Sequence, residues 1–318
     1  MNKAAFAAPR CPGTLKEGLS TYCPATLRKL FSGKQVFHVL NESFSEKVWR
    51  PAQIQGAHFG GQQWFRMRQE KNQLVPDKSG VFILKTVFHG GSSMRFHMEQ
   101  PGNEHLCLQL ASQVFQMETF ENALIFFPDG QPAVISNFFS TTNGFMNFET
   151  LQQKISDKPI SNYRQMALLI DTFCAASMIA KERLFIQVVF EWLIGNSDAQ
   201  SKNFGVVKTI RGDDTTAPLF NSICTRLHEL GPELALSGGL FEGDKHTPEF
   251  RENGSYTRNE FTAFGNRIGM LSHRIEKVLN DFVSRKENAL QLIDHAFLPD
   301  EAKAIVRFNF LERLNRLK

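Results

Sequence analysis

The chain has 318 residues, enough for two packed lobes of ~150 residues each. Hydrophobic residues make up 42% of it and charged residues 21%, which is ordinary for a globular protein and excludes a disordered or fibrous chain. The 36 basic and 32 acidic residues are scattered without a run of like charge, so no direct binding of nucleic acid is expected.

The cysteines and the apolar runs indicate the compartment. The five cysteines are odd in number and widely spaced, unlike a disulfide framework, and favour a reducing environment. Cys11 and Cys23 lack the paired C-x-x-C spacing of a zinc site, so an ordinary structural role is the stronger interpretation for them. No apolar run approaches the ~20 residues that span a bilayer, and residues 1–10 contain no signal-peptide core. We therefore predict a cytoplasmic protein without a membrane partner.

The first part of the chain predicts a sheet with helices beside it. Pro24 can begin a helix that continues through Phe31. Residues 62–68 and 80–87 are short extended runs separated by glycine, proline and aspartate, which predicts antiparallel strands. The apolar spacing that follows predicts a helix starting near Glu104.

A hairpin closes this part, with strands at 123–127 and 133–139 around the turn at 128–130. The rest of the chain has helical periodicity, and helices are expected at 163–182, 184–194, 258–270, 272–285, 287–296 and 299–317. The fold class that follows is α+β. We expect an N-terminal lobe, 1–140, with a Gly-rich loop, the antiparallel sheet and one helix, and an all-helical lobe, 141–318, with polar loops around residues 198 and 221.

The most informative segment is 190–205, where an apolar helix end runs into a polar loop through Gly195. Asp198 and Asn203 lie five residues apart with Lys202 between them. A phosphotransferase uses this spacing when a carboxylate accepts the proton of the attacking hydroxyl and an amide oxygen binds magnesium. The same pair of residues also occurs often by chance, so it needs support from elsewhere in the chain.

Lys85 provides that support. It is the one charged residue in the apolar run 81–86, and burying an ammonium costs free energy unless it meets an anion. Glu104 is the expected partner, because kinases pair a strand lysine with a helix glutamate to hold the lysine against the nucleotide phosphates. The alternative for Glu104 is an acid that only favours the positive end of the helix dipole.

Together these segments resemble the HipA-like serine/threonine kinases of bacterial toxin-antitoxin modules, especially their shorter HipT-like members. The family's loop pattern Asp-x-His-x-Lys-Asn is similar to the run from Asp198 to Asn203, with Gln200 in place of histidine. Residues 83–85 resemble the strand that carries the nucleotide-binding lysine, and 103–104 resemble the start of the next helix. Further similarities lie near both ends of the chain, at 11–14, 27–31, 297–301 and 307–317.

The resemblance implies a two-lobed, protein-kinase-like fold that uses ATP and Mg²⁺. It implies Asp198 as the catalytic residue and Asn203 and Asn221 as metal ligands. The positions that it assigns to nucleotide binding are Lys85, Glu104, Gln55, Gly56, Ala57, His58 and Lys202. It further implies a protein hydroxyl as the acceptor, an aminoacyl-tRNA synthetase as the substrate and an antitoxin protein as the partner.

Four positions depart from the family pattern. Asn221 stands where the family has a magnesium-binding aspartate, and loss of that charge should weaken metal binding. Gln53 and Gln55 replace serines that can be autophosphorylated, so that regulation should be absent. Together with Gln200, these changes keep a second interpretation open: a pseudokinase that retains the fold and acts as a nucleotide-binding or partner-binding module.

Overall fold

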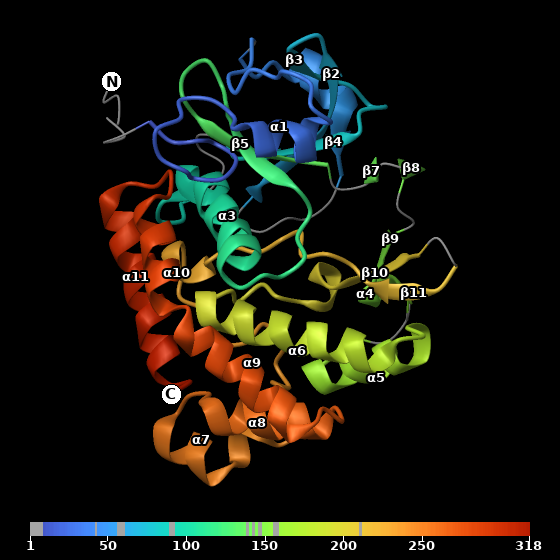
Figure 1. Ribbon diagram of the computed structural model, residues 1–318, viewed down its shortest axis with the longest axis vertical. Coiled ribbons are helices and arrows are strands. Elements are labelled where there is room, and N and C mark those ends of the chain that lie inside the picture. The colour runs from blue at the N-terminus through green and yellow to red at the C-terminus, as the bar shows by residue number, and fades with distance from the viewer. Residues whose placement is uncertain are drawn as a thin grey trace.

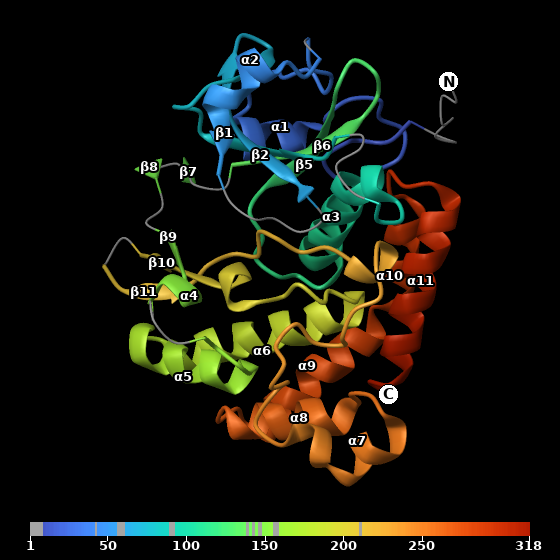
Figure 2. The same ribbon diagram turned by 180° about the vertical axis from the view of Figure 1, so that it is seen from behind.

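The computed structural model has a sheet-bearing first part and a mostly helical second part (Figure 1). The described residues are 9–41, 43–55, 61–88, 93–137, 140–141, 144–145, 148–154, 159–209 and 212–318. Helices α1 (Pro24–Phe31) and α2 (Glu46–Trp49) lie at one end of the molecule and α7 (Pro248–Asn253) at the other. Helix α3 (Gln100–Gln109) lies between the two parts in both ribbon views (Figure 2).

An antiparallel sheet of six strands forms the centre of the first part. Its strands are β1 (Gln53–Ile54), β2 (Gln63–Glu70), β3 (Gln73–Pro76), β4 (Phe82–Thr86), β5 (Asn122–Phe126) and β6 (Pro132–Ser136). Their order is β1-β2-β4-β6-β5, and β3 pairs with β2. The two predicted strand runs and the hairpin are confirmed. β3 was missed because its four residues include Pro76, which reads as part of a turn.

Both faces of β4 are covered, which explains why all five of its residues are buried. On one face Leu84 belongs to the same apolar cluster as Phe31 of α1. On the other face lies α3, whose Leu106 packs in one cluster with Val134 of β6. Successive side chains of a strand point to opposite faces, so Lys85 points toward α3.

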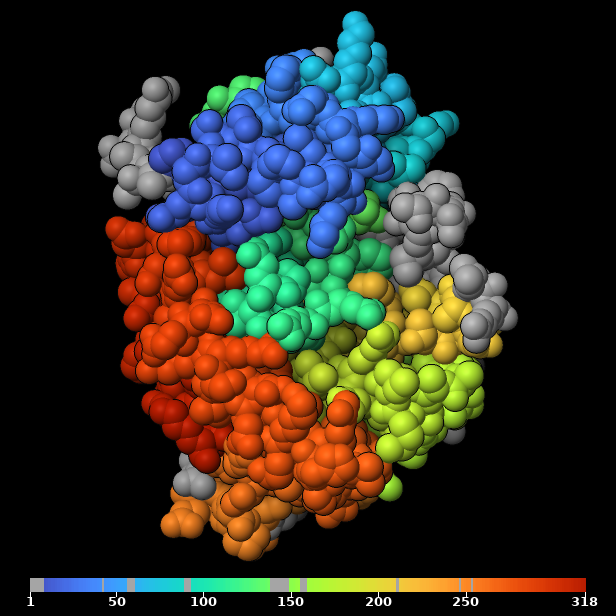
Figure 3. Space-filling view, viewed as in Figure 1, coloured from blue at the N-terminus to red at the C-terminus, as the bar shows by residue number. Residues whose placement is uncertain are grey.

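Helix α3 begins at Gln100, four residues before the predicted start, with a proline in its first turn. All ten of its residues are buried, and the chain continues into a π-helical turn at Leu110–Val114. The region of the chain around this segment lies between the first part and the helical part in the space-filling view (Figure 3). A Cβ at Gly102 would lie 2.6 Å from the carbonyl oxygen of Phe297, so glycine permits this close approach. Glu104 therefore lies within the helix and not at its start.

The other helices belong to the second part of the chain. They are α4 (Leu151–Lys154), α5 (Tyr163–Phe173), α6 (Ser177–Ile194), α7, α8 (Arg258–Arg267), α9 (Ser272–Ser284), α10 (Lys286–Asp294) and α11 (Asp300–Asn315). The predicted break at residue 183 is wrong. The chain leaves the helical conformation at Cys174 instead, where its backbone pairs with Asp214. None of the helices in the described ranges is both long and apolar enough to cross a bilayer.

The α+β class is confirmed, but the expected all-helical second lobe needs a correction. A three-stranded antiparallel sheet has the order β11 (Asp214–Thr216), β10 (Gly205–Lys208), β9 (Phe148–Thr150), and β7 (Ser140–Thr141) pairs with β8 (Gly144–Phe145). Strands of two to four residues carry too little alternation to be recognised in sequence. β10 begins two residues after Asn203, so this sheet anchors the polar loop. The division into lobes 1–140 and 141–318 stays a prediction.

Candidate active site

Lys85 and Glu104 form a buried ion pair between β4 and α3. The lysine Nζ lies 2.5 Å from Oε1 of Glu104, and each residue is 1% exposed. Nζ also donates to the carbonyl oxygen of Phe220 at 2.8 Å and lies 4.3 Å from the centre of the Trp64 ring. The predicted partner of Lys85 is confirmed. The alternative of a helix-start acid is wrong, because Glu104 is buried within α3.

The second oxygen of Glu104 is held from β2, by residues that sequence reasoning missed. Gln62 Nε2 donates to Oε2 of Glu104 at 3.0 Å, and Trp64 Nε1 donates to Oε1 of Gln62 at 3.3 Å. Trp64 lies directly opposite Lys85 in the β2–β4 register, so both side chains are on one face. The available signal was the alternation of Gln62 and Trp64, which becomes informative only once the register is known.

The carbonyl oxygen of Phe220 contacts the Lys85 ammonium from the second part of the chain. The residue before it pairs with the loop after α3: Leu219 N donates to Glu118 O at 2.8 Å, and Phe120 N donates to Leu219 O at 3.0 Å. The rings of Phe120 and Phe220 pack edge to face, with centres 6.4 Å apart. The ammonium contacts described above are all with protein groups, so a phosphate must displace one of them to reach Lys85.

The loop after α6 presents the carboxylate of Asp198. Gly195 ends the helix with a φ of +79°, a backbone conformation that glycine adopts readily. Oδ1 of Asp198 lies 3.3 Å from Lys202 Nζ and accepts a hydrogen bond from Gln200 Nε2 at 3.2 Å. Burial raises the pKa of the Asp198 carboxyl, and the Lys202 ammonium opposes that shift. A carboxylate with a raised pKa is the stronger proton acceptor near neutral pH.

A short chain of contacts connects Asp198 to Lys85. Asn203 Nδ2 donates to the backbone carbonyl of Asp198 at 2.5 Å, and Asn221 Nδ2 donates to Oδ1 of Asn203 at 2.9 Å. Asn221 follows Phe220, whose carbonyl oxygen accepts from Lys85. The structure therefore connects the lysine, the backbone of Asp198 and both carboxamides through a continuous series of contacts.

The two carboxamides do not fit the predicted magnesium site in this arrangement. Mg²⁺ prefers hard oxygen ligands, carboxylates among them, in near-ideal octahedral geometry. Oδ1 of Asn203 instead accepts a hydrogen bond from Asn221. In the part of the chain that the structure describes, no group of three or more His, Cys, Asp or Glu side chains is placed to hold a metal ion. That Asn221 weakens metal binding stays a prediction.

A carboxylate at position 221 should strengthen metal binding. In Asn221→Asp we expect the Mg²⁺ concentration for half-maximal stabilisation by ATP to fall about tenfold, because the carboxylate adds negative charge beside a hard cation. A thermal-shift titration with ATP and increasing MgCl₂ measures this concentration. Asn221→Ser is the matched control, since it removes the amide without adding charge. Identical titrations for Asn221→Asp and the wild type would show that position 221 does not face a metal.

Glu191, which sequence reasoning missed, supports the loop from inside α6. It is 2% exposed, and its Oε2 accepts hydrogen bonds from Asn196 Nδ2 and Ser222 Oγ, each at 2.8 Å. Oδ1 of Asn196 in turn accepts the backbone N–H of Asp198 at 2.9 Å. Burial raises the pKa of Glu191 to about 8, although its two hydrogen bonds oppose the shift. The available signal was a lone acid in the apolar run 188–194.

The raised pKa of Glu191 predicts a pH-dependent stability. The folded chain keeps this proton up to about pH 8, whereas the unfolded chain loses it near the ordinary value of 4.5. Its contribution to stability is therefore complete below the ordinary pKa and is lost as the pH rises toward about 8. The neutral isostere Glu191→Gln should raise the Tm relative to the wild type, and the difference should grow over that range.

Differential scanning calorimetry across that pH range measures the difference in Tm. Glu287→Gln is the control, because the Glu287 side chain is 81% exposed and should give no pH-dependent difference. A difference between Glu191→Gln and the wild type that is the same at every pH would contradict the raised pKa.

Four predicted nucleotide contacts fall in the loop after β1. Gln55 is described and exposed. Gly56, Ala57 and His58 lie outside the described residues, so their role stays a prediction. The neighbouring Gln53, on β1, donates to Oε1 of Gln63 at 3.3 Å.

Comparison with known proteins places the chain in a family. The model of the HipA-like C-terminal domain matches residues 57–290, which is most of the chain. The chain belongs to the HipA-like family. This assignment confirms the family that the sequence motifs resemble, and the arrangement of Lys85, Asp198 and Asn203 is thus found in a HipA-like chain.

Solved structures include chains similar to this HipA-like chain. A chain from the complex of the Shewanella oneidensis MR-1 toxin-antitoxin proteins HipA and HipB with operator DNA aligns with a TM-score of 0.62 and 14% identity, covering 86% of this chain and 67% of that one. The Helicobacter pylori proinflammatory kinase CtkA is a weaker match, with a TM-score of 0.48 and 14% identity over 80% of this chain and 90% of that one.

A curated relative from Haemophilus influenzae, named "Putative kinase", is 21% identical over 181 residues. The match covers 54% of this chain and 53% of the relative, so the chain spans about half the length of that protein.

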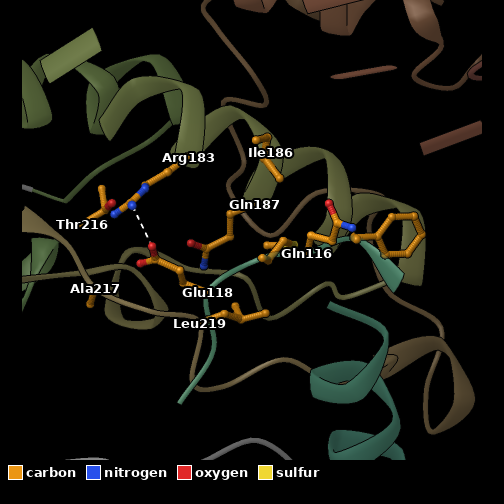
Figure 4. Close-up of a pocket in the computed structure, with 10 residues that line it drawn as sticks. Gln116, Glu118, Arg183, Ile186, Gln187, Thr216, Ala217 and Leu219 are labelled. Carbon is orange, nitrogen blue, oxygen red and sulfur yellow. Dashed lines mark hydrogen bonds and ion pairs between the residues drawn. The ribbon is translucent and has the colours of Figure 1, made fainter. Parts of the chain in front are cut away.

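This HipA-like chain has a cavity of about 270 Å³ beside the segment that leads to Phe220 (Figure 4). Its walls come from α6, the loop after π-helical residues 110–114, and residues 216–219. Arg183 and Glu118 bridge it with an ion pair of 2.7 Å. Neither Lys85 nor Asp198 lines this cavity, so it backs the segment before Phe220 and is not the candidate active site.

Proposed function

We propose that this chain is an ATP-dependent serine/threonine protein kinase of the shorter HipT-like type. The observation that supports it best is the buried pair of Lys85 and Glu104, which is connected through the segment at Phe220 to the loop of Asp198. A hydrophobic pair of similar volume would avoid the desolvation cost of two buried charges. The pair is therefore better explained by function than by stability.

In this proposal each polar group has one task. Asp198 orients the attacking hydroxyl and accepts its proton. Lys85, held by Glu104, binds the phosphates after it exchanges the carbonyl of Phe220 for a phosphate oxygen. Lys202 places a second positive charge beside the transferred phosphoryl group. The backbone of the loop from Gln55 to His58 cradles the phosphates.

The biological role follows from the likeness to the HipA chain, which comes from a complex with HipB and operator DNA. We propose that this chain is the toxin of a toxin-antitoxin module and binds an antitoxin protein. An aminoacyl-tRNA synthetase as the phosphorylated substrate and a cytoplasmic location complete the proposal, and both rest on the family resemblance.

One observation favours a second candidate, a pseudokinase. The side-chain amide of Asn221 donates a hydrogen bond to Oδ1 of Asn203, and the carbonyl oxygen of Phe220 accepts one from Lys85. Both contacts fill positions that a kinase offers to metal and phosphate. A chain that keeps these contacts acts by holding nucleotide without transfer, or by docking to a partner.

Phosphate transfer separates the two candidates. The purified chain is incubated with ATP labelled at the γ-phosphate, MgCl₂ and a bacterial lysate, beside Asp198→Ala. Labelled protein with the wild type alone supports the kinase, and equal labelling by both chains excludes it. No transfer together with a rise in Tm on adding ATP supports the pseudokinase.

A further inference from the structure

Two cysteine side chains meet at the start of the described chain. The sulfur of Cys11 accepts the backbone N–H of Gly13 at 3.4 Å and of Cys23 at 3.2 Å. These two N–H groups direct their partial positive charge at the Cys11 sulfur, and they hold the start of α1 against the turn that contains Cys11.

One threonine hydroxyl lies close to both sulfurs. Oγ1 of Thr26 is 3.8 Å from Cys11 Sγ and 3.3 Å from Cys23 Sγ. Oγ1 of Thr14 is 3.8 Å from Cys23 Sγ on the other side. Burial alone would raise the pKa of Cys23, but hydrogen bonds from Thr26, Thr14 and Cys11 together lower it to about 7. A thiol with such a pKa is substantially ionised near neutral pH, and the thiolate is the reactive form.

Cys23 also borders an open cavity of about 890 Å³, so small solutes can approach it. The cavity is lined by charged groups from both parts of the chain, among them Lys16, Glu17 and His295. Glu17 lies 3.4 Å from His295 Nε2 and 3.9 Å from Arg10 Nε, so its carboxylate has a cationic partner in Arg10. Cys23 itself is 8% exposed, and Cys11 is fully buried.

We propose that Cys11 and Cys23 are a modification site that hydrogen peroxide converts from a dithiol to a disulfide. The Cys23 thiolate attacks the O–O bond of peroxide, which forms a sulfenic acid on Cys23 and releases hydroxide. The Cys11 sulfur then attacks the Cys23 sulfur, the S–O bond breaks, and the departing hydroxide leaves with the Cys11 proton as water. The two sulfurs lose two electrons and the peroxide gains two.

The site is connected to the helix that carries Glu104. The carbonyl of Gly13 lies 3.2 Å from His105 Nε2, and the carbonyl of Thr14 accepts from Gln113 Nε2 at 3.0 Å. Linking Cys11 to Cys23 therefore fixes a turn that is hydrogen-bonded to α3 one residue from Glu104.

The other cysteines provide internal controls. Burial raises the pKa of Cys174 to about 11 and of Cys224 to about 11, and it raises that of Cys107 well above its ordinary value. These thiols are protonated at neutral pH and should react slowly.

The test is peroxide oxidation of the reduced full chain, followed by peptide mapping. We expect a mass loss of about 2 Da, which is two hydrogens, and a peptide that joins Cys11 to Cys23. Cys23 should react about tenfold faster than Cys174. In Cys11→Ser the sulfenic acid of Cys23 should persist and be trapped by dimedone, whereas Cys174→Ser should behave as the wild type.

The readout needs no kinase activity, so it is independent of the proposed function. Mapping of the wild type decides the question even if a variant fails to fold. A disulfide between other cysteines, oxidation of Cys23 without a link to Cys11, or equal rates at Cys23 and Cys174 would each overturn the proposal.

Discussion

Replacing Glu104 with alanine should lower the free energy of unfolding by about 3–5 kcal/mol. The change removes the carboxylate 2.5 Å from Lys85 Nζ and leaves the ammonium in a position that is 1% exposed. The remaining contacts, the carbonyl of Phe220 and the ring of Trp64, carry no full negative charge. An uncompensated buried charge is among the most costly single changes in a protein core.

Urea denaturation of the wild type and Glu104→Ala measures this difference. The matched control is the double variant Lys85→Met/Glu104→Leu, which removes both charges and keeps the volume, and it should recover most of the loss. If the double variant were as unstable as Glu104→Ala, the cost would come from lost packing and not from the unpaired ammonium.

Replacing Asp198 with asparagine should lower the rate of phosphate transfer by about 10²–10⁴-fold, the usual contribution of a positioned proton acceptor. The asparagine keeps the volume and can still accept from Gln200, but it cannot take the hydroxyl proton. The loop should stay folded, because Asn203 donates to the backbone carbonyl of Asp198 and Asn196 accepts from its backbone N–H.

Initial rates of labelling at saturating ATP measure this loss, and a Tm within about 1 °C of the wild type would show that the loop is intact. Asp294→Asn is the control, since Asp294 at the end of α10 pairs with Arg307 of α11, is absent from the candidate site and should not affect transfer. A rate for Asp198→Asn within twofold of the wild type would remove Asp198 from the catalytic role.

The parts of the site that could be predicted from sequence are those that follow from the free-energy cost of burying a charge. Lys85 needs an anion because burying a charged group in an apolar strand costs free energy, and Glu104 was its expected partner because kinases pair a strand lysine with a helix glutamate. The spacing of Asp198 and Asn203 placed both on one loop. These inferences need only local sequence patterns and the free-energy cost of burying an unpaired charge.

The rest depends on how distant segments pack. The contact of Phe220 with Lys85 joins residues 135 positions apart, through a backbone pairing that leaves no periodic signal. Gln62, which precedes β2 by one residue, becomes a partner of Glu104 only once the pairing of Trp64 with Lys85 fixes which face lies against α3. In the same way the helix break at Cys174 follows from its pairing with Asp214, and no glycine or proline marks it.

The hydrogen bond between Lys85 and Phe220 links anion binding at Lys85 to the geometry of the Asn203–Asn221 pair. An anion that takes this proton of the ammonium must first break the bond to the Phe220 carbonyl. Since Asn221 is the next residue, a shift of the Phe220 peptide would also change the geometry of the Asn221–Asn203 hydrogen bond. By thermodynamic reciprocity, any change that loosens the Asn203–Asn221 pair makes the lysine easier to engage, and an engaged lysine frees the oxygen of Asn203.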